Sequence, residues 1–392
     1  MSREFTGITI IGVIGRAERI GGAEGAFLTL MEGFQQILGA DVQVATHLAS
    51  SHSDARFGVT VLRPDGRRPG PRMVWRLRQL IAVAPDGTIL FPFQIRSNII
   101  TSLANALLPR DRRLPIVVND RANIDAMLTP LRPGIVGVLK ARSFRALTRT
   151  CYRRASYIVC NSVGNAERVR AFLGQPSPPV STILNPIDAK GIQSRFRPRD
   201  RSKLISARNP LITAHGRLDN AQKGWDALLA AFARIRAVKP EARLRIVGDG
   251  PDRPALQAMA ARLGVAIACE WPGHLVDPLP AIEAGDVYAF PSRWEGLPNA
   301  LLEAVALGLP VVATDCPTGP AEILSTPKPC GYLVPVDAVD QLAEGLLSLL
   351  AYGETRATLS ARARDRANDF SLEVAVAAYA KIFREIRARR QA

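Results

Sequence analysis

The stretch "DVYAFPSRWEGLPNALLEAVALGLPVVAT" (residues 286–314) predicts a strand, a turn, a helix and a second strand in close succession. Its two ends, "DVYAF" and "PVVAT", are short apolar runs of the kind that form parallel strands buried on both faces. Between them, apolar residues recur at helical spacing from about Leu297 to Leu307. A strand, a helix and a strand in this order are the repeating unit of a doubly wound α/β sheet.

The same pattern extends along both halves of the chain. In the second half, further strand candidates separated by helix-length segments lie at 211–216, 244–248, 265–269 and 330–335. In the first half, six strand candidates lie at 8–15, 41–46, 88–93, 115–120, 156–162 and 181–185. We therefore predict two doubly wound, Rossmann-like α/β domains.

A polar and basic connector, "NPIDAKGIQSRFRPRDRSK" (185–203), lacks apolar periodicity and separates the two halves. The last segment has apolar residues at helical spacing and a basic end, which predicts a terminal helix. Such a helix needs an apolar surface, and either domain can supply it, the first by a return of the chain. The predicted organisation is an N-terminal domain over 1–187, a hinge over 188–204, a C-terminal domain over 205–369 and a terminal helix over 370–392.

Composition limits the class of protein. The chain has 392 residues, of which 47% are hydrophobic, so it can bury the cores of two domains. Its five cysteines form no C-x-x-C pair, which argues against a disulfide framework or a zinc ribbon and favours a reducing cytoplasm. No apolar run approaches the roughly 18 to 20 residues needed to span a bilayer.

The net charge of +16 is unevenly spread, because residues 1–190 carry +12 of it. The excess gathers in 67–80 and 132–154, where arginines interleave with apolar residues such as Trp75 and Leu139. Basic amphipathic segments of this kind suit the anionic inner face of a membrane, and a solvated surface is an equally simple interpretation. Nucleic acid is a weaker one, since the sequence has no helix-turn-helix, zinc-finger spacing or aromatic RNA-binding motif.

Two carboxylates flank the predicted helix of the opening stretch. Glu295 stands just before the helix and Glu303 about two turns into it, about 12 Å further along the axis and rotated by about 80°. That separation is too large to clamp one atom, but it suits two parts of an elongated ligand whose phosphates lie at the helix start. A structural interpretation remains open, in which Glu295 stabilises the helix dipole and Glu303 is a surface residue.

Residues 286–324 as a whole resemble the E-x7-E region of GT4-type retaining glycosyltransferases, in particular the bacterial enzymes that add hexoses or N-acetylhexosamines to surface glycans. Further resemblances follow in the same order along the chain, at "GGAE" (21–24), "ILNPID" (183–188), "HGRLDNAQKGWDALLAAF" (215–232), "LRIVGDGPDRPAL" (244–256) and "WPGH" (271–274). The resemblance implies a GT-B fold, with two Rossmann-like domains facing a central cleft.

The resemblance also implies roles for individual residues. Glu295 would contact the hydroxyls of the donor sugar, and Glu303 would hold the ribose of the nucleotide. Arg217 and Lys223 would supply cations to the diphosphate, which can stabilise the leaving group without a metal. The sequence has no D-x-D triplet, so we expect neither a metal nor another cofactor. The remaining donor contacts would come from the backbone at Gly296 and Leu297.

Glycines and a charged pair complete the expected site. Gly21 and Gly22 would let a loop of the first domain approach the donor, and Gly248 would shape the base pocket; ordinary tight turns are the alternative for each. Asp120 and Arg121 end the predicted strand at 115–120, where they would position donor or acceptor or form a buried structural ion pair. We count Asp120 with Glu295, Arg217 and Lys223 as candidate catalytic residues.

The expected function is therefore a metal-independent, retaining transfer of a hexose or N-acetylhexosamine. The donor would be a UDP-sugar, with GDP-mannose as the alternative, and the acceptor a lipid-linked glycan precursor of exopolysaccharide, O-antigen or lipopolysaccharide synthesis. Such a protein would lie on the inner face of the cytoplasmic membrane. Two other classes remain open: a sugar-nucleotide epimerase that shares the fold, and a nucleic-acid-binding protein.

Overall fold

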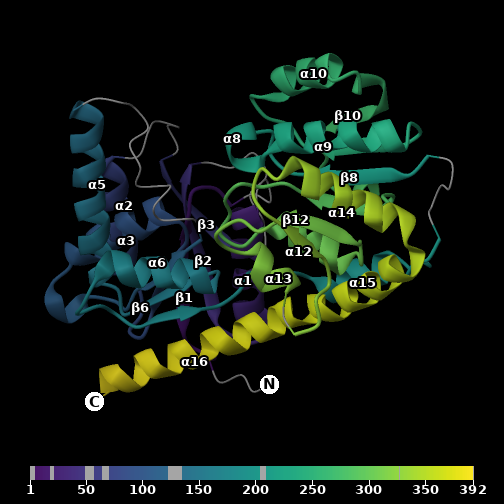
Figure 1. Cartoon of the computed structure of the whole chain (residues 1–392). Coiled ribbons are helices and arrows are strands. Elements are labelled where there is room, and N and C mark those ends of the chain that lie inside the picture. The colour runs from purple at the N-terminus through teal and green to yellow at the C-terminus, as the bar shows by residue number, and fades with distance from the viewer. Residues whose placement is uncertain are drawn as a thin grey trace. The chain divides into compact units, whose positions relative to one another are not determined.

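The computed structural model describes residues 5–17, 22–48, 57–63, 70–121, 135–203, 209–325 and 327–391. It divides into two compact units (Figure 1). The first consists of Met1–Pro186 together with Leu372–Ala392, and the second of Ile187–Ser371. Each unit is built on parallel strands joined by helices, as the apolar runs of the sequence predict.

Seven described strands form the sheet of the first unit. One group pairs in the order β3-β2-β1-β4 and comprises β1 (Thr9–Ile14), β2 (Asp41–Leu48), β3 (Gly58–Arg63) and β4 (Ile89–Pro92). The other pairs in the order β5-β6-β7 and comprises β5 (Val117–Asp120), β6 (Tyr157–Cys160) and β7 (Val180–Thr182). Parallel bridges from Leu90 to Ile116 and from Phe93 to Asn119 join β4 to β5. The strands all run in one direction, so their carboxyl ends meet at one edge.

Side chains alternate along these strands between two hydrophobic cores. Ile10 and Ile14 of β1 belong to one core, whereas Ile11 and Val13 belong to the other. The helices that cover the sheet are α1 (Gly22–Gln36), α2 (Pro71–Ala82), α3 (Ile95–Ala106), α5 (Ile135–Arg153) and α6 (Val163–Leu173), with a short 3-10 helix at Arg110–Arg112.

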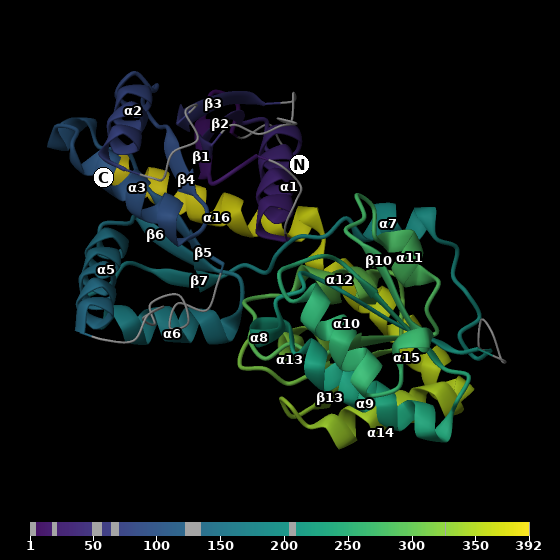
Figure 2. The ribbon, with the colours of Figure 1, turned by 90° about the horizontal axis from the view of Figure 1, so that it is seen from above.

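The C-terminal helix α16 (Leu372–Gln391) packs on the first unit, which decides between the two alternatives that the sequence leaves open (Figure 2). Its Tyr379 and Phe383 are fully buried, with ring centroids 5.4 and 5.3 Å from that of Phe34 on α1. Gly33 allows this approach, because a Cβ there would lie 2.6 Å from a methyl group of Val376. The second unit, Ile187–Ser371, lies in sequence between α16 and the rest of the first unit, so the first unit is built from both ends of the chain.

The second unit contains one six-stranded parallel sheet. Its strands are β8 (Leu211–His215), β9 (Arg243–Val247), β10 (Cys269–Gly273), β11 (Val287–Phe290), β12 (Val311–Thr314) and β13 (Tyr332–Val334). They pair in the order β10-β9-β8-β11-β12-β13, which is the order of a dinucleotide-binding fold. The order reverses between β8 and β11, and ligands of such sheets bind beyond the carboxyl ends of the strands at that point.

The helices of the second unit are mostly short. They are α7 (Ala189–Arg195), α8 (Asn220–Lys223), α9 (Trp225–Val238), α10 (Arg253–Arg262), α11 (Leu279–Glu283), α12 (Asn299–Ala306), α13 (Pro320–Leu324), α14 (Val339–Ala351) and α15 (Gly353–Arg366), with 3-10 helices at Ala266–Ala268 and Ala367–Phe370. Among the described residues, no helix is both long enough and apolar enough to cross a membrane.

Two predicted elements differ from the structure, and one strand of the structure was not predicted. The strand predicted at 265–269 is wrong, because Ala266–Ala268 is a 3-10 helix and β10 begins at Cys269. The helix predicted from Leu297 begins at Asn299, since Pro298 disfavours helical backbone at the residue before it. Strand β3 was not predicted: it lies at the edge of its sheet, and four of its six residues are not buried.

The packing of α16 yields a stability prediction. Replacing Phe383 by Ala should lower the free energy of unfolding of the first unit by about 3 to 5 kcal/mol, because it removes a fully buried ring from a cluster of aromatic side chains. Val374→Ala, at a position of the same helix that is 53% exposed, should change it by less than about 0.5 kcal/mol. Urea denaturation of both variants measures the difference, and equal stabilities would show that α16 does not complete this core.

Candidate active site

The candidate site lies at the carboxyl ends of β8 and β11, where the strand order of the second unit reverses. Strand β8 ends at His215 and continues into Gly216 and Arg217. Gly248, which follows β9, has a φ of +140°, and a Cβ there would overlap the carbonyl oxygen of Gly216. Glycine is therefore required at 248 for the loops after β8 and β9 to pack together.

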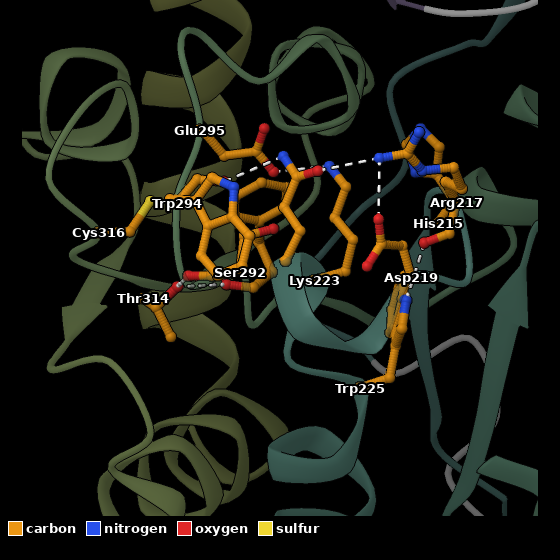
Figure 3. A network of polar contacts seen from close by, with 12 residues as sticks. His215, Arg217, Asp219, Lys223, Trp225, Ser292, Trp294, Glu295, Thr314 and Cys316 are labelled. Atoms are coloured by element: carbon orange, nitrogen blue, oxygen red, sulfur yellow. Dashed lines mark hydrogen bonds and ion pairs between the residues drawn. The ribbon is translucent and has the colours of Figure 1, made fainter. Parts of the chain in front are cut away.

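Lys223 and Glu295 form an ion pair at the centre of the site (Figure 3). The Lys223 Nζ lies 2.6 Å from Glu295 Oε1, and the two side chains are 16% and 9% exposed. The ammonium group also lies 5.9 Å from the ring centroid of Phe290, at the end of β11. Gly224 turns the chain after Lys223 with a φ of +63°, and a Cβ there would overlap the carbonyl oxygen of Pro291.

The loop that carries Glu295 is held from both sides. Arg293 donates to both carboxylate oxygens of Asp226, at 2.8 and 3.0 Å, and to Asp337 at 2.8 Å. The hydroxyl of Thr318 donates to the backbone carbonyl oxygen of Glu295 itself. These contacts hold the backbone of the loop, and the ion pair with Lys223 holds the Glu295 carboxylate.

Glu303 on α12 is held by a histidine rather than by a lysine or arginine. His215 Nε2 lies 2.7 Å from Glu303 Oε2, and His215 Nδ1 lies 2.9 Å from the hydroxyl of Tyr288 on β11. Tyr288 is fully buried, and burial raises its pKa well above the usual value, so the hydroxyl keeps its proton and donates it to Nδ1. In the neutral imidazole, a donor at Nδ1 places the ring proton on Nε2, the nitrogen that faces Glu303.

Arg217 lies in a row with Lys223 and Glu295 (Figure 3). Its guanidinium donates to Asp219 at 3.0 Å and to the Gln222 side chain at 3.1 Å, while 63% of the side chain stays exposed. Gln222 in turn donates to the backbone carbonyl oxygen of Trp294 at 3.2 Å. The site therefore presents one exposed cation and one partly buried cation beside two oriented carboxylates.

Asp120 and Arg121 lie together at the end of β5 in the first unit, where both are buried. Asp120 accepts hydrogen bonds from the Tyr152 hydroxyl at 2.7 Å and from the Asn165 amide at 3.0 Å. Arg121 lies 4.6 Å from the ring centroid of Phe93. It also donates hydrogen bonds to Asn119, Ile183, Asn185 and Tyr379.

The remaining predicted residues fall in three places. Gly22 is the first residue of α1, and Gly21 lies outside the described residues. Gly296 and Leu297 lie between Glu295 and the start of α12, in the loop that Thr318 holds. Within the described part of the chain, no group of three or more His, Cys, Asp or Glu residues is placed to hold a metal ion.

His215 and Tyr288 were not predicted as site residues. The sequence places each of them in a predicted strand, His215 near the end of 211–216 and Tyr288 in the middle of 286–290, but it does not show their contact. Only the pairing of β8 with β11, which places Tyr288 opposite Thr213, brings the two rings together.

Comparison with known proteins agrees with this architecture. The fold is that of GT-B proteins: HepE of Anabaena, solved with UDP-glucose, superposes with a TM-score of 0.75 at 20% identity, over 96% of this chain and 99% of that one. The family model described as Glycosyltransferase Family 4 matches residues 20–190, and the one described as Glycosyl transferases group 1 matches residues 209–352. The chain belongs to the GT4-type glycosyltransferases of the GT-B fold.

Named relatives come from bacterial glycan synthesis. The chain is 31% identical to the lipopolysaccharide core biosynthesis glycosyltransferase LpsE of Rhizobium meliloti, over 60% of this chain and 66% of that protein. It is 24% identical to the amylovoran biosynthesis glycosyltransferase AmsD of Erwinia amylovora, over 88% and 96%. Several other curated relatives are matched over about half of their length or less.

The contact between Tyr288 and His215 can be tested directly. In the wild-type protein, ¹⁵N NMR should find the His215 proton on Nε2. Tyr288→Phe leaves the buried Nδ1 without a donor and should lower the free energy of unfolding of the second unit by about 1 to 3 kcal/mol. Tyr352→Phe, at a side chain that is 63% exposed, is the matched control. A proton found on Nδ1 would contradict the assigned direction of both hydrogen bonds.

Proposed function

We propose that the protein is a retaining glycosyltransferase that moves a hexose or an N-acetylhexosamine from a UDP-sugar to a lipid-linked glycan precursor. The observation that carries this proposal is that Arg217, Lys223 and Glu295 lie in a row at the reversal point of the second sheet (Figure 3). Glu303 lies against His215, the last residue of β8, at the same edge of the sheet. The site combines cations for a diphosphate with carboxylates for the hydroxyl groups on either side of it.

The ligand-free contacts suit an elongated donor. Glu303, oriented by His215, is the proposed partner of the ribose hydroxyls, and Glu295 is the proposed partner of the sugar hydroxyls. A diphosphate between them would draw on Lys223 and on the exposed guanidinium of Arg217. Backbone groups near Gly296 and Leu297 and the glycine-shaped loop at Gly248 complete the proposed donor site.

The proposed chemistry needs no divalent metal, since two cations of the chain can neutralise the charge that develops on the leaving nucleoside diphosphate. Retention would follow from attack on the same face that the phosphate leaves, with a phosphate oxygen helping to take the proton of the acceptor. In the first unit, Gly21 and Gly22 are proposed to let a loop approach the donor. Asp120 and Arg121 are the proposed residues on the acceptor side, and Asp120 is also a candidate catalytic residue.

The relatives support the choice of donor and acceptor. HepE of Anabaena was solved with UDP and with UDP-glucose. A relative in Campylobacter jejuni is named for transferring N-acetylgalactosamine to a diphospho-undecaprenol glycan. GDP-mannose remains the alternative donor, because a Corynebacterium glutamicum relative, 32% identical over 40% of this chain, is named as GDP-mannose-dependent.

Nucleotide-induced thermal stabilisation tests the donor site. We expect UDP, in EDTA, to stabilise the protein more than GDP, ADP or dTDP, and a ligand at 100 times its dissociation constant adds about 2.7 kcal/mol. Lys223→Ala should abolish most of this stabilisation. Lys203→Ala, at a lysine side chain that is 85% exposed, is the matched control. Stabilisation by GDP alone would support the mannose donor, and no response to any nucleotide would overturn the proposal.

The basic faces of the first unit are the proposed membrane contact. Helices α2 and α5 each carry several arginines and no acidic residue, and Trp75 and Leu139 on them are more than half exposed. Replacing Arg72, Arg76, Arg78, Arg142 and Arg145 together by Gln should weaken sedimentation with phosphatidylglycerol vesicles at low salt. Unchanged sedimentation would show that these five arginines belong to a solvated surface and not to a membrane contact.

A further inference from the structure

A large cavity in the first unit lies apart from every residue assigned so far to donor or acceptor sugar. It has a volume of about 1000 Å³ and opens between α2 and α3, which lie side by side (Figure 1). We propose that this cavity binds the single hydrocarbon chain of a phosphate-bearing lipid, namely the lipid anchor of the glycan acceptor. The identity of that anchor rests on the proposed function.

The walls of the cavity are apolar. Val74 and Trp75 line it from α2, and Ile100, Leu103 and Ala106 line it from α3. Leu107, directly after α3, lines it too and is 54% exposed, as is 53% of Trp75. Apolar surface left open to water in a hollow of this size is energetically unfavourable, and it is favourable to cover it with hydrocarbon.

The remaining lining is strongly cationic. Arg72 and Arg76 contribute from α2 and Arg154 from the segment after α5, and no acidic residue lines the cavity among the residues that the structure describes. Arg76 is oriented by a 3.0 Å hydrogen bond to the carbonyl oxygen of Leu62. Arg78 lies over the Trp75 ring at 4.8 Å and so helps to fix the indole at the wall.

An apolar hollow beside three arginines is complementary to a molecule that has a hydrocarbon chain and a multiply charged head. Guanidinium groups bind phosphate through paired hydrogen bonds, and three of them suit a head with more than one negative charge. A bilayer phospholipid offers two chains and a single negative charge, so the single-chain lipid phosphate or diphosphate is the better match. An acidic amphipathic peptide is a different class of ligand, and its binding is one outcome of the test.

The test titrates the full-length protein with octyl, decyl and dodecyl phosphate below their micelle concentrations and follows tryptophan fluorescence. Each added methylene should tighten binding about fourfold, from about 0.8 kcal/mol for each buried methylene. Trp75→Phe should remove the fluorescence change while calorimetry still detects binding. Dodecanol and inorganic phosphate, each offering one half of the ligand, should bind at least tenfold more weakly than dodecyl phosphate.

Two variants test the apolar walls and the lining arginines of the cavity separately. Ala106→Phe fills the cavity from α3 and should weaken dodecyl phosphate at least tenfold, and Arg72→Gln with Arg154→Gln should reduce the preference for dodecyl phosphate over dodecanol. Arg110→Gln, at an exposed arginine outside the cavity, is the control for charge. Stabilisation by UDP should be unchanged in every variant, so a failed donor site and a failed cavity give different results.

Three results would overturn the proposal. Binding that is indifferent to chain length, or that Ala106→Phe leaves unchanged, would show that the cavity takes no chain. A Trp75 response to phosphatidylglycerol vesicles but not to the alkyl phosphates would assign the face to the bilayer surface. Binding of an acidic amphipathic peptide that the alkyl phosphates do not displace would assign it to a protein partner.

Discussion

The carboxyl ends of β8 and β11 lie side by side at the point where the strand order reverses, and every side chain of the candidate donor site depends on that adjacency. Because the strands are parallel, the residues that follow both of them emerge at the same edge of the sheet. His215 and Arg217 follow from one strand, and Glu295 and Glu303 from the other. Residues about 80 positions apart in sequence thereby form one site.

Each carboxylate of the site has a partner on β8 or on the segment that follows it. A buried carboxylate is costly unless it is paired or hydrogen-bonded, and the buried Glu295 meets this condition through Lys223. Glu303, whose side chain is 31% exposed, is paired with His215. The two carboxylates therefore have different partners. Glu295 is paired with a cation that a phosphate could also engage, whereas Glu303 is paired with an imidazole whose other nitrogen contacts the Tyr288 hydroxyl. The proposed assignment of Glu295 to the sugar and of Glu303 to the ribose rests on the resemblance of the motif, and this difference is compatible with it.

The sequence predicts the α/β class and most strands, because buried parallel strands appear as short apolar runs with helical segments between them. The GT-B fold is predicted through the resemblance of the motifs to the family. It does not predict β3, whose residues are mostly unburied, nor the start of β10, because Val265 and Ala268 are apolar for reasons of packing in a 3-10 helix. The motifs identify four residues of the candidate donor site, namely Arg217, Lys223, Glu295 and Glu303. The His215 and Tyr288 contact could not be predicted, since it depends on strand pairing, and the cavity between α2 and α3 depends on tertiary packing.

The central claim is that Glu295 binds the sugar of the donor and Lys223 its diphosphate. Calorimetric titration of UDP and of the UDP-sugar that binds most tightly, into wild type and Glu295→Gln, tests it most directly. The account predicts that the variant keeps its affinity for UDP and loses the additional affinity that the sugar provides. An undiminished preference for the UDP-sugar in Glu295→Gln would contradict the assignment of this carboxylate to the sugar.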